Sequence, residues 1–109
     1  MKLKLPSVVE QYFDISNGGD ASRLATCFST NASVFDENRT HEGIDAIEAW
    51  LRETQQAFAF QVEPVEVIQG AGTLTVTARV TGDFPGSPVR LNHVFTLADG
   101  RISSLEIAP

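Results

Sequence analysis

The chain has 109 residues, of which 42% are hydrophobic and 20% charged, enough apolar material for one small folded core. Its net charge of −6 and its eight scattered Lys and Arg residues provide no basic stripe, which argues against a nucleic-acid partner. No apolar run follows the N-terminal lysines and no segment approaches the length of a membrane span, so we expect a cytoplasmic protein without membrane contact.

The first half of the chain predicts three helices. Apolar residues recur at three- and four-residue steps in three segments, at 6–17, 21–28 and 43–58. Ser7 and Glu10 match a capping box at the start of the first helix, and Asp20 is placed to cap the second. Asn17-Gly18-Gly19 should end the first helix.

The remaining segments predict strands, at 32–36, 60–68, 73–81, 89–97 and 101–107. Ser29-Thr30-Asn31 and the polar stretch 37–42 are expected to be turns. Pro64 cannot donate to a strand ladder, so the strand 60–68 should lie at an edge or carry a bulge. Helices followed by hairpin-linked strands predict a single α+β domain, in which an antiparallel sheet is covered by helices on one face.

The predicted strands 73–81 and 89–97 each alternate between two faces. One face is apolar, and the second is rich in Thr, Arg and Val. This face could be exposed to water or pack on a second copy of the chain across a two-fold axis, and its β-branched side chains favour packing. We therefore expect a homodimer that forms through the sheet.

Asp36 is a carboxylate that the fold does not obviously need. On strand alternation it shares a face with Val34. If that face looks into a half-open apolar cup, desolvation makes Asp36 a candidate general base. If it does not, Asp36 simply opens the following turn by accepting backbone N–H bonds from Asn38 or Arg39.

Two further residues could do chemistry. His93 is the ionisable group on the otherwise apolar face formed with Leu91, Phe95 and Leu97, and is either a core histidine or an acid/base group in the cup. Tyr12 lies on the apolar stripe of the first helix, so its hydroxyl needs a partner. The spacing of Asp36, His41 and His93 matches no compact ligand motif, so we expect no metal, and no phosphate-binding loop or other cofactor motif is present.

The order of several short motifs resembles the nuclear transport factor 2-like superfamily, in particular its SnoaL-like and ketosteroid-isomerase-like members. The motifs are Tyr12-Phe13-Asp14 followed by Gly19-Asp20, Ala32-Ser33-Val34-Phe35-Asp36, Gly43-Ile44-Asp45-Ala46-Ile47 with Trp50, and Gly100-Arg101-Ile102. The resemblance implies a cone in which a curved antiparallel sheet is wrapped by three N-terminal helices around a pocket.

In ketosteroid isomerases an aspartate moves a proton while a tyrosine and a protonated aspartic acid hold the oxyanion. The resemblance places Asp36 at the base position and Tyr12 at the oxyanion tyrosine, whereas His93 stands where the second acid is expected. We assign the wall of the same pocket to further side chains, namely Trp50, Phe13, Phe95, His41 and Val34.

Three functions fit this pattern. The first is an isomerase, cyclase or dehydratase that uses Asp36 as general base on an apolar carbonyl compound. The second is a non-catalytic binder of a small apolar ligand in the same pocket. The third is a dimeric interaction module whose cup is filled by its own side chains.

Overall fold

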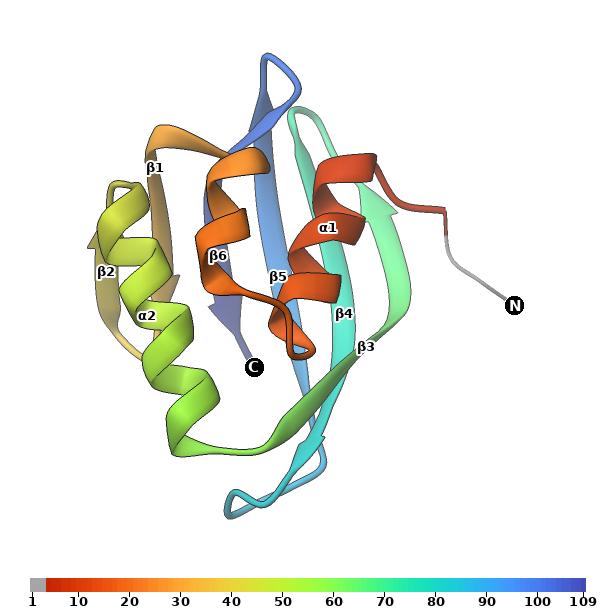
Figure 1. Ribbon diagram of the computed structural model, residues 1–109. Coiled ribbons are helices and arrows are strands. Elements are labelled where there is room, and N and C mark those ends of the chain that lie inside the picture. The colour runs from red at the N-terminus through yellow and green to blue at the C-terminus, as the bar shows by residue number, and fades with distance from the viewer. Residues whose placement is uncertain (1–3) are drawn as a thin grey trace.

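The computed structural model describes residues 4–109 and confirms the predicted α+β fold (Figure 1). Its helical segments are α1 (Ser7–Ser16), the 3-10 helix η1 (Ala21–Thr26) and α2 (Ile44–Ala57). Its strands are β1 (Phe28–Asp36), β2 (Arg39–Glu42), β3 (Phe60–Gln69), β4 (Thr73–Gly82), β5 (Val89–Ala98) and β6 (Arg101–Ala108).

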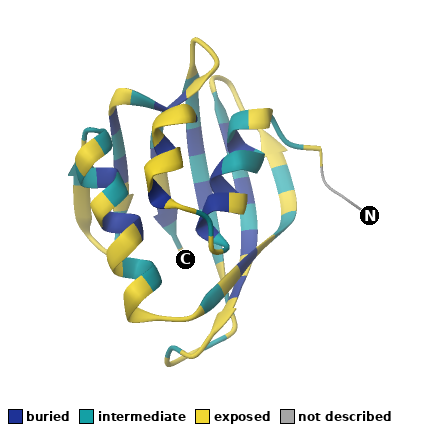
Figure 2. Ribbon diagram, in the orientation of Figure 1, coloured by how far each residue is buried: buried dark blue, intermediate teal, exposed yellow. Residues whose placement is uncertain are grey.

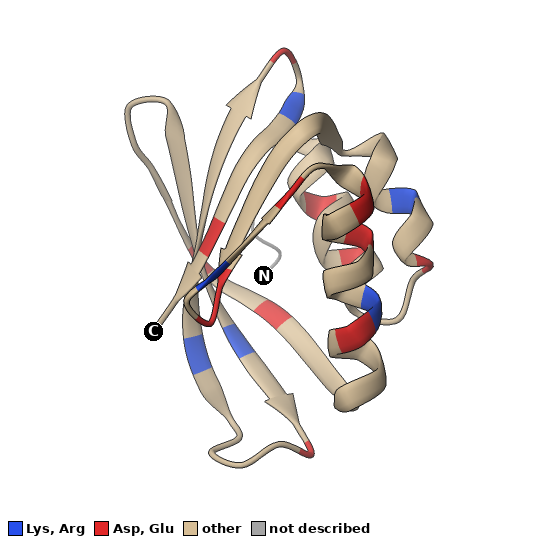
Figure 3. Cartoon of the chain, turned by 90° about the vertical axis from the view of Figure 1, so that its left-hand side faces the viewer, with Lys and Arg blue, Asp and Glu red and all other residues tan. Residues whose placement is uncertain are grey.

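The strands form one curved sheet in the order β2-β1-β6-β5-β4-β3. Neighbouring strands are antiparallel, except that β1 joins β6 in parallel. The helices cover one face of the sheet, and the side view shows the helical layer standing off from the sheet's concave side (Figures 1 and 3). Among residues 4–109, no helix lies on the other face of β3 to β6 (Figure 3).

The start of α1 differs from the prediction of a capping box. Pro6 is the N-cap residue, and no side chain caps the helix. The Pro6 carbonyl accepts hydrogen bonds from the backbone N–H groups of Val9 and Glu10, both at 3.0 Å. Ser7 is already the first helical residue, so its hydroxyl is one position too late to serve as the cap.

The segment after α1 also differs from its prediction. Asp20 does cap η1, because its carboxylate accepts the Ser22 N–H at 3.0 Å. The helix ends at Thr26, however, because the Cys27 carbonyl accepts the Ile102 N–H at 2.8 Å and draws the chain into the sheet. The predicted turn at 29–31 therefore lies inside β1, where the pairing with β6 is irregular.

The polar stretch 37–42 contains a strand that the sequence did not reveal. Glu37 and Asn38 have left-handed φ values of 51° and 62°, which is the geometry of a two-residue hairpin turn. The chain therefore reverses at once, and Arg39 pairs with Asp36 at the start of β2. The turn holds Asp36 at the last position of β1, next to the concave side of the sheet.

Strand β3 agrees with what Pro64 predicts. It is an edge strand of the sheet, and its pairing with β4 shifts between Pro64 and Glu66. Both features suit proline, because neither requires it to donate a backbone hydrogen bond to a neighbouring strand. Phe60 and Val62, near the start of β3, line one side of a pocket.

The core lies between the sheet and the helices (Figure 2). In β4 the predicted alternation is confirmed, because Leu74, Val76, Ala78 and Val80 are all buried. Within residues 4–109, no helix has the length and apolarity needed to cross a bilayer.

Candidate functional site

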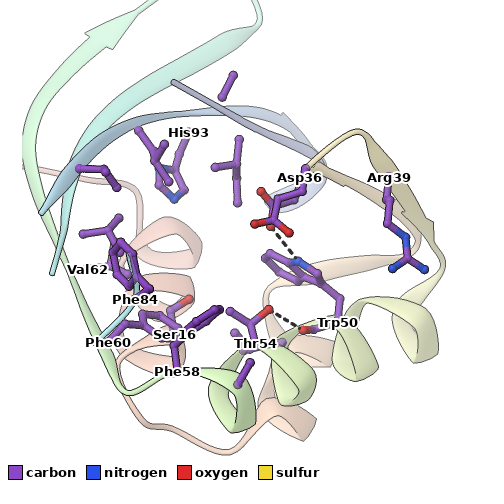
Figure 4. A pocket seen from close by; sticks show the side chains of 18 of the residues that line it. Ser16, Asp36, Arg39, Trp50, Thr54, Phe58, Phe60, Val62, Phe84 and His93 are labelled. Carbon is purple, nitrogen blue, oxygen red and sulfur yellow. Dashed lines mark hydrogen bonds between the residues drawn. The ribbon is translucent and has the colours of Figure 1, made fainter. Parts of the chain in front are cut away.

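A half-open pocket of about 880 Å³ lies between the concave side of the sheet and the helices (Figure 4). Its wall takes side chains from α1, α2 and all six strands, and from the turn and loop segments at 37–38 and 84–85. A cavity of this size is in the range that holds a small organic molecule.

Asp36 is held in the wall of this pocket by Trp50. The Trp50 indole Nε1 donates a hydrogen bond of 3.1 Å to Asp36 Oδ2. Burial raises the pKa of the Asp36 carboxyl group, whereas the Trp50 hydrogen bond opposes that shift. Glu37 raises the same pKa further, and His41 lowers it. A carboxylate that is desolvated but still held by one donor has the properties of a general base.

Tyr12 enters the pocket from α1 and is packed among aromatic rings. Its ring centroid lies 5.2–6.3 Å from those of Phe13, Phe28, Phe95 and His93. Burial raises the pKa of the phenol above its usual range, while the nearby Ser16 hydroxyl lowers it. Asp36 is close enough to raise the pKa of Tyr12 by charge. The phenol is therefore a neutral hydrogen-bond donor near the candidate base.

His93 lines the pocket from β5, although only 3% of its surface is exposed. Burial lowers the pKa of His93 to about 4, against the opposing effect of the Leu91 and Val76 backbone groups. Its imidazole is therefore uncharged at neutral pH and can donate through one nitrogen and accept through the other. Figure 4 shows a nitrogen of this ring turned toward the pocket interior.

Five of the eight side chains that the sequence singled out line this pocket: Tyr12, Asp36, His41, Trp50 and His93. The His41 and Trp50 rings lie 6.0 Å apart at its rim. The expectation that Phe13, Phe95 and Val34 form its wall is not met, because these buried side chains belong to the core behind it. Periodicity tells which face of an element is inward, but not which inward residues face an empty space.

The sequence did not reveal an aromatic cluster at the other end of the pocket. Phe58, Phe60 and Phe84 line it there, and the Phe58 and Phe84 rings meet edge to face at 5.9 Å. The Asp83 carboxylate accepts the Ala59 N–H at 3.1 Å and so fastens the loop that carries Phe84. Phe58 is 39% exposed, which is the exposure expected of an apolar side chain at a pocket mouth.

The charge of the lining is mostly negative. Three acidic side chains line the pocket, namely Asp36, Glu37 and Glu53. Among residues 4–109, Arg39 is the one Lys or Arg side chain that lines it. The net charge of the whole chain, −6, has the same sign. Such a field disfavours anionic ligands. Within the part of the chain that the structure describes, no three His, Cys, Asp or Glu side chains gather as metal ligands would.

Comparison with known families gives this site its context. The model of the SnoaL-like domain matches residues 9–105. The chain belongs to the SnoaL-like family. This membership agrees with the fold, because the sheet and helices match a solved structure that has a ketosteroid isomerase-like fold. No protein of curated function matches this SnoaL-like chain significantly.

Several solved structures are similar to this SnoaL-like protein. A proposed polyketide cyclase from Sinorhizobium meliloti is 41% identical, with a TM-score of 0.90 over 94% of each chain. A Catenulispora acidiphila protein with a ketosteroid isomerase-like fold, solved with trimethylamine, is 18% identical, with a TM-score of 0.84 over 97% of this chain and 87% of its own. SalBIII, an epoxide hydrolase/cyclase-like enzyme of salinomycin pyran-ring formation, is 22% identical, with a TM-score of 0.79 over 93% and 86%. The protein is thus a small-molecule pocket protein of the SnoaL-like family.

Proposed function

We propose that this protein is a cofactor-independent enzyme that uses Asp36 as general base on an apolar carbonyl compound, in an isomerase-, cyclase- or dehydratase-type reaction. The observation that carries the proposal is the Asp36 carboxylate, partly desolvated in a pocket wall and held by the Trp50 N–H at 3.1 Å. This arrangement keeps a proton acceptor in a defined position inside an apolar cavity.

In the proposed reaction, Asp36 removes a proton from the carbon next to the carbonyl group. The electron pair of that C–H bond moves into a new C=C bond, and the carbonyl oxygen takes the negative charge. Tyr12 and His93 are neutral groups that can each donate a hydrogen bond to this oxygen.

Protonated Asp36 then returns the proton as the carbonyl C=O bond re-forms. In isomerisation, the far carbon of a conjugated enolate takes the proton. In cyclisation, the enolate carbon bonds to a second carbonyl carbon of the same molecule, and the oxygen of that carbonyl takes the proton. In dehydration, the C–O bond at the next carbon breaks, and the departing hydroxyl group takes the proton and leaves as water.

Two observations narrow the substrate. The pocket is apolar at the phenylalanine cluster and negatively charged near Asp36, which favours a neutral compound over a carboxylate or phosphate ester. The 41% identity to a proposed polyketide cyclase supports a carbonyl-rich substrate of the polyketide kind. The expected substrate is a neutral, largely apolar molecule with an acidic C–H bond next to a carbonyl group.

The base assignment can be tested without the natural substrate. In D2O, 2-tetralone exchanges the hydrogens next to its carbonyl group, and NMR measures the rate. We expect the wild-type protein to accelerate this exchange and Asp36→Asn to lose about 10²–10⁴-fold of the acceleration, the usual contribution of a general base. The melting temperature of Asp36→Asn should not fall, because the substitution removes a partly buried charge.

The neighbouring Glu37→Gln is the matched control. Glu37 also lines the pocket, is exposed, and loses the same charge on substitution. Exchange catalysis by Glu37→Gln should stay near the wild-type rate. Equal losses in both variants would mean that charge at the pocket mouth, and not a base at Asp36, drives the exchange.

A second function, non-catalytic binding of a small apolar ligand, is favoured by His93. A neutral imidazole stands where the resemblance leads us to expect an acid, and it is a weaker donor to an oxyanion than a carboxylic acid. A ligand that raises the melting temperature and is recovered chemically unchanged would favour this function. The third function, a module with a filled cup, is disfavoured by the 880 Å³ cavity.

A further inference from the structure

Two buried polar atoms in the wall of the pocket have no hydrogen-bond partner. They are Ser16 Oγ and His93 Nδ1, and each residue is only 3% exposed. Among residues 4–109, no other buried side-chain nitrogen or oxygen atom lacks a partner. Native proteins leave few such atoms unpaired, because each has lost its hydrogen bonds to water without gaining a replacement. That both belong to residues lining one cavity needs an explanation.

Ser16 had a local solution available that it does not use. Serine and threonine hydroxyls within helices commonly donate to the carbonyl group four residues earlier. Thr54, on the α2 side of the same pocket, does so, with its Oγ1 at 2.9 Å from the Trp50 carbonyl oxygen. The Ser16 hydroxyl instead remains unpaired, and Figure 4 shows its oxygen on the side of the pocket.

Tyr12 lies close to both residues that carry the unpaired atoms. It lies one helical turn before Ser16 on α1, and hydrogen bonding from the Ser16 hydroxyl lowers the pKa of the phenol, although the two groups do not meet with the geometry of a formed hydrogen bond. Its ring centroid is 6.3 Å from that of His93. We call Tyr12, Ser16 and His93 the oxygen subsite. A hydroxyl, a phenol and a neutral imidazole can each donate and accept, and so can a ligand hydroxyl group.

We propose that Ser16 is a specificity-determining residue that contacts the ligand, and that its unpaired hydroxyl selects hydroxylated apolar compounds over their deoxygenated analogues. The inference rests on the proposed function only in taking the pocket as the site for a small apolar compound. It adds that the ligand carries a hydroxyl group, and it assigns a role to a side chain outside the proposed proton transfer.

Paired titrations of 6-hydroxy-1-tetralone and 1-tetralone test the proposal, because the two compounds differ by one hydroxyl group. We expect the wild-type protein to bind the hydroxylated compound about tenfold more tightly, as one hydrogen bond to an otherwise unpaired buried group implies. Ser16→Ala should bring this preference to within about threefold of unity and change the affinity for 1-tetralone less than twofold.

Thr54→Val is the matched control, because it also removes one hydroxyl from the pocket lining, but one that already has a partner. It should keep the tenfold preference. Equal weakening of both compounds by Ser16→Ala would make Ser16 a packing residue and overturn the proposal. A wild-type protein that binds neither compound, or both equally, would also overturn it.

The melting temperatures of the ligand-free variants provide a second readout. Ser16→Ala removes an unpaired buried hydroxyl, so it should leave the melting temperature unchanged or raise it, as substitutions in binding sites often do. Thr54→Val should lower it. A lower melting temperature for Ser16→Ala would show that the hydroxyl is satisfied in the free protein and would count against the proposal. The Asp36→Asn exchange experiment is independent, so the two proposals can fail separately.

Discussion

Two ionisable residues of the pocket, Asp36 and His93, are both shifted toward their neutral forms. Burial is the largest cause in each case: it raises the pKa of Asp36 and lowers that of His93. Asp36 keeps a charge-stabilising partner in Trp50, whereas His93 Nδ1 has no partner within residues 4–109. Burial thus favours the neutral form of both groups, and the Trp50 hydrogen bond favours the charged form of Asp36.

The lowered pKa of His93 predicts a loss of stability in mild acid. The unfolded protein binds the His93 proton near pH 6.5, whereas the folded protein binds it only near pH 4. Its contribution is fully present above pH 6.5 and is lost as the pH falls toward 4, by about 3 kcal/mol at most. Asp36 acts in the opposite direction, because its raised pKa favours the folded protein as the pH falls.

Urea denaturation of the wild type and of His93→Phe at pH 7 and pH 4.5 separates these effects. Asp36 is present in both proteins, so its contribution cancels in the difference. The wild type should lose more free energy of unfolding than His93→Phe between the two pH values. An equal loss in both proteins would show that protonation of His93 does not lower the free energy of unfolding, which would contradict the prediction.

The sequence predicted part of the site at the level of single residues, for identifiable reasons. Strand alternation correctly placed Asp36 on the inward face with Val34, because a two-residue period requires no tertiary information. It could not tell that Val34 is covered by core residues while Asp36 meets the cavity. Ser16 gave no signal at all, because its significance depends on a partner that is missing in three dimensions.

At the level of elements, Asn17 connects α1 to the edge strand β3. Its side-chain amide donates to the Val62 carbonyl at 2.9 Å, and its side-chain oxygen accepts the Val62 N–H at 2.6 Å. The amide thus pairs with Val62 as a neighbouring strand would. The sequence indicated Asn17 only as a helix stop, because a contact 45 residues away leaves no local pattern.

Asn17→Ala should lower the free energy of unfolding by about 1–3 kcal/mol, because it leaves two backbone groups of Val62 without their partner. Hydrogen exchange should show that the Val62 amide loses protection more than the amides of central strand β5 do. The exposed Asn38→Ala, in the turn after β1, is not a suitable control because of its left-handed backbone. Asn31→Ala, an exposed position in β1, is suitable and should change stability little. Equal protection of Val62 in Asn17→Ala and wild type would contradict the connecting role.

The predicted elements fail mainly where the chain is polar. Pro64 carries a local chemical constraint, and both consequences drawn from it, the edge position and the bulge, are confirmed. The segment 39–42 is polar and mostly exposed, so its strand structure comes from pairing with β1 rather than from burial. The segment 29–31 is also polar and mostly exposed, and it lies where the pairing of β1 with β6 is irregular. Hydrophobic periodicity has nothing to detect in such strands.

At the scale of the whole molecule, the outer face of the sheet is the surface through which we expect two copies to associate. The outward side chains of β4 and β5 are mostly β-branched or uncharged polar, and they include a Thr77–Asn92 hydrogen bond of 2.8 Å. The strands here carry no helix on this side (Figure 3). A two-fold axis through this face would let the same residues meet in both copies.

Val94→Lys tests this expectation. Val94 lies on β5, between Thr75 of β4 and Glu106 of β6, and alternates with the buried His93 and Phe95. A lysine on that central strand would add a charged side chain from each copy to the proposed interface, where the cost of desolvating it opposes association. Sedimentation at tens of micromolar should give twice the 11.8 kDa chain mass for the wild type and the single mass for Val94→Lys.

The exposed Thr40→Lys on β2, at the opposite edge of the sheet from β3, is the control and should remain dimeric. A monomeric wild type, or a dimeric Val94→Lys, would contradict association through this face. The pocket supplies a further check, because its lining lies on the helix side of the sheet, away from the outer face. Val94→Lys should therefore bind a pocket ligand as the wild type does, which would separate the oligomeric state from the chemistry at Asp36.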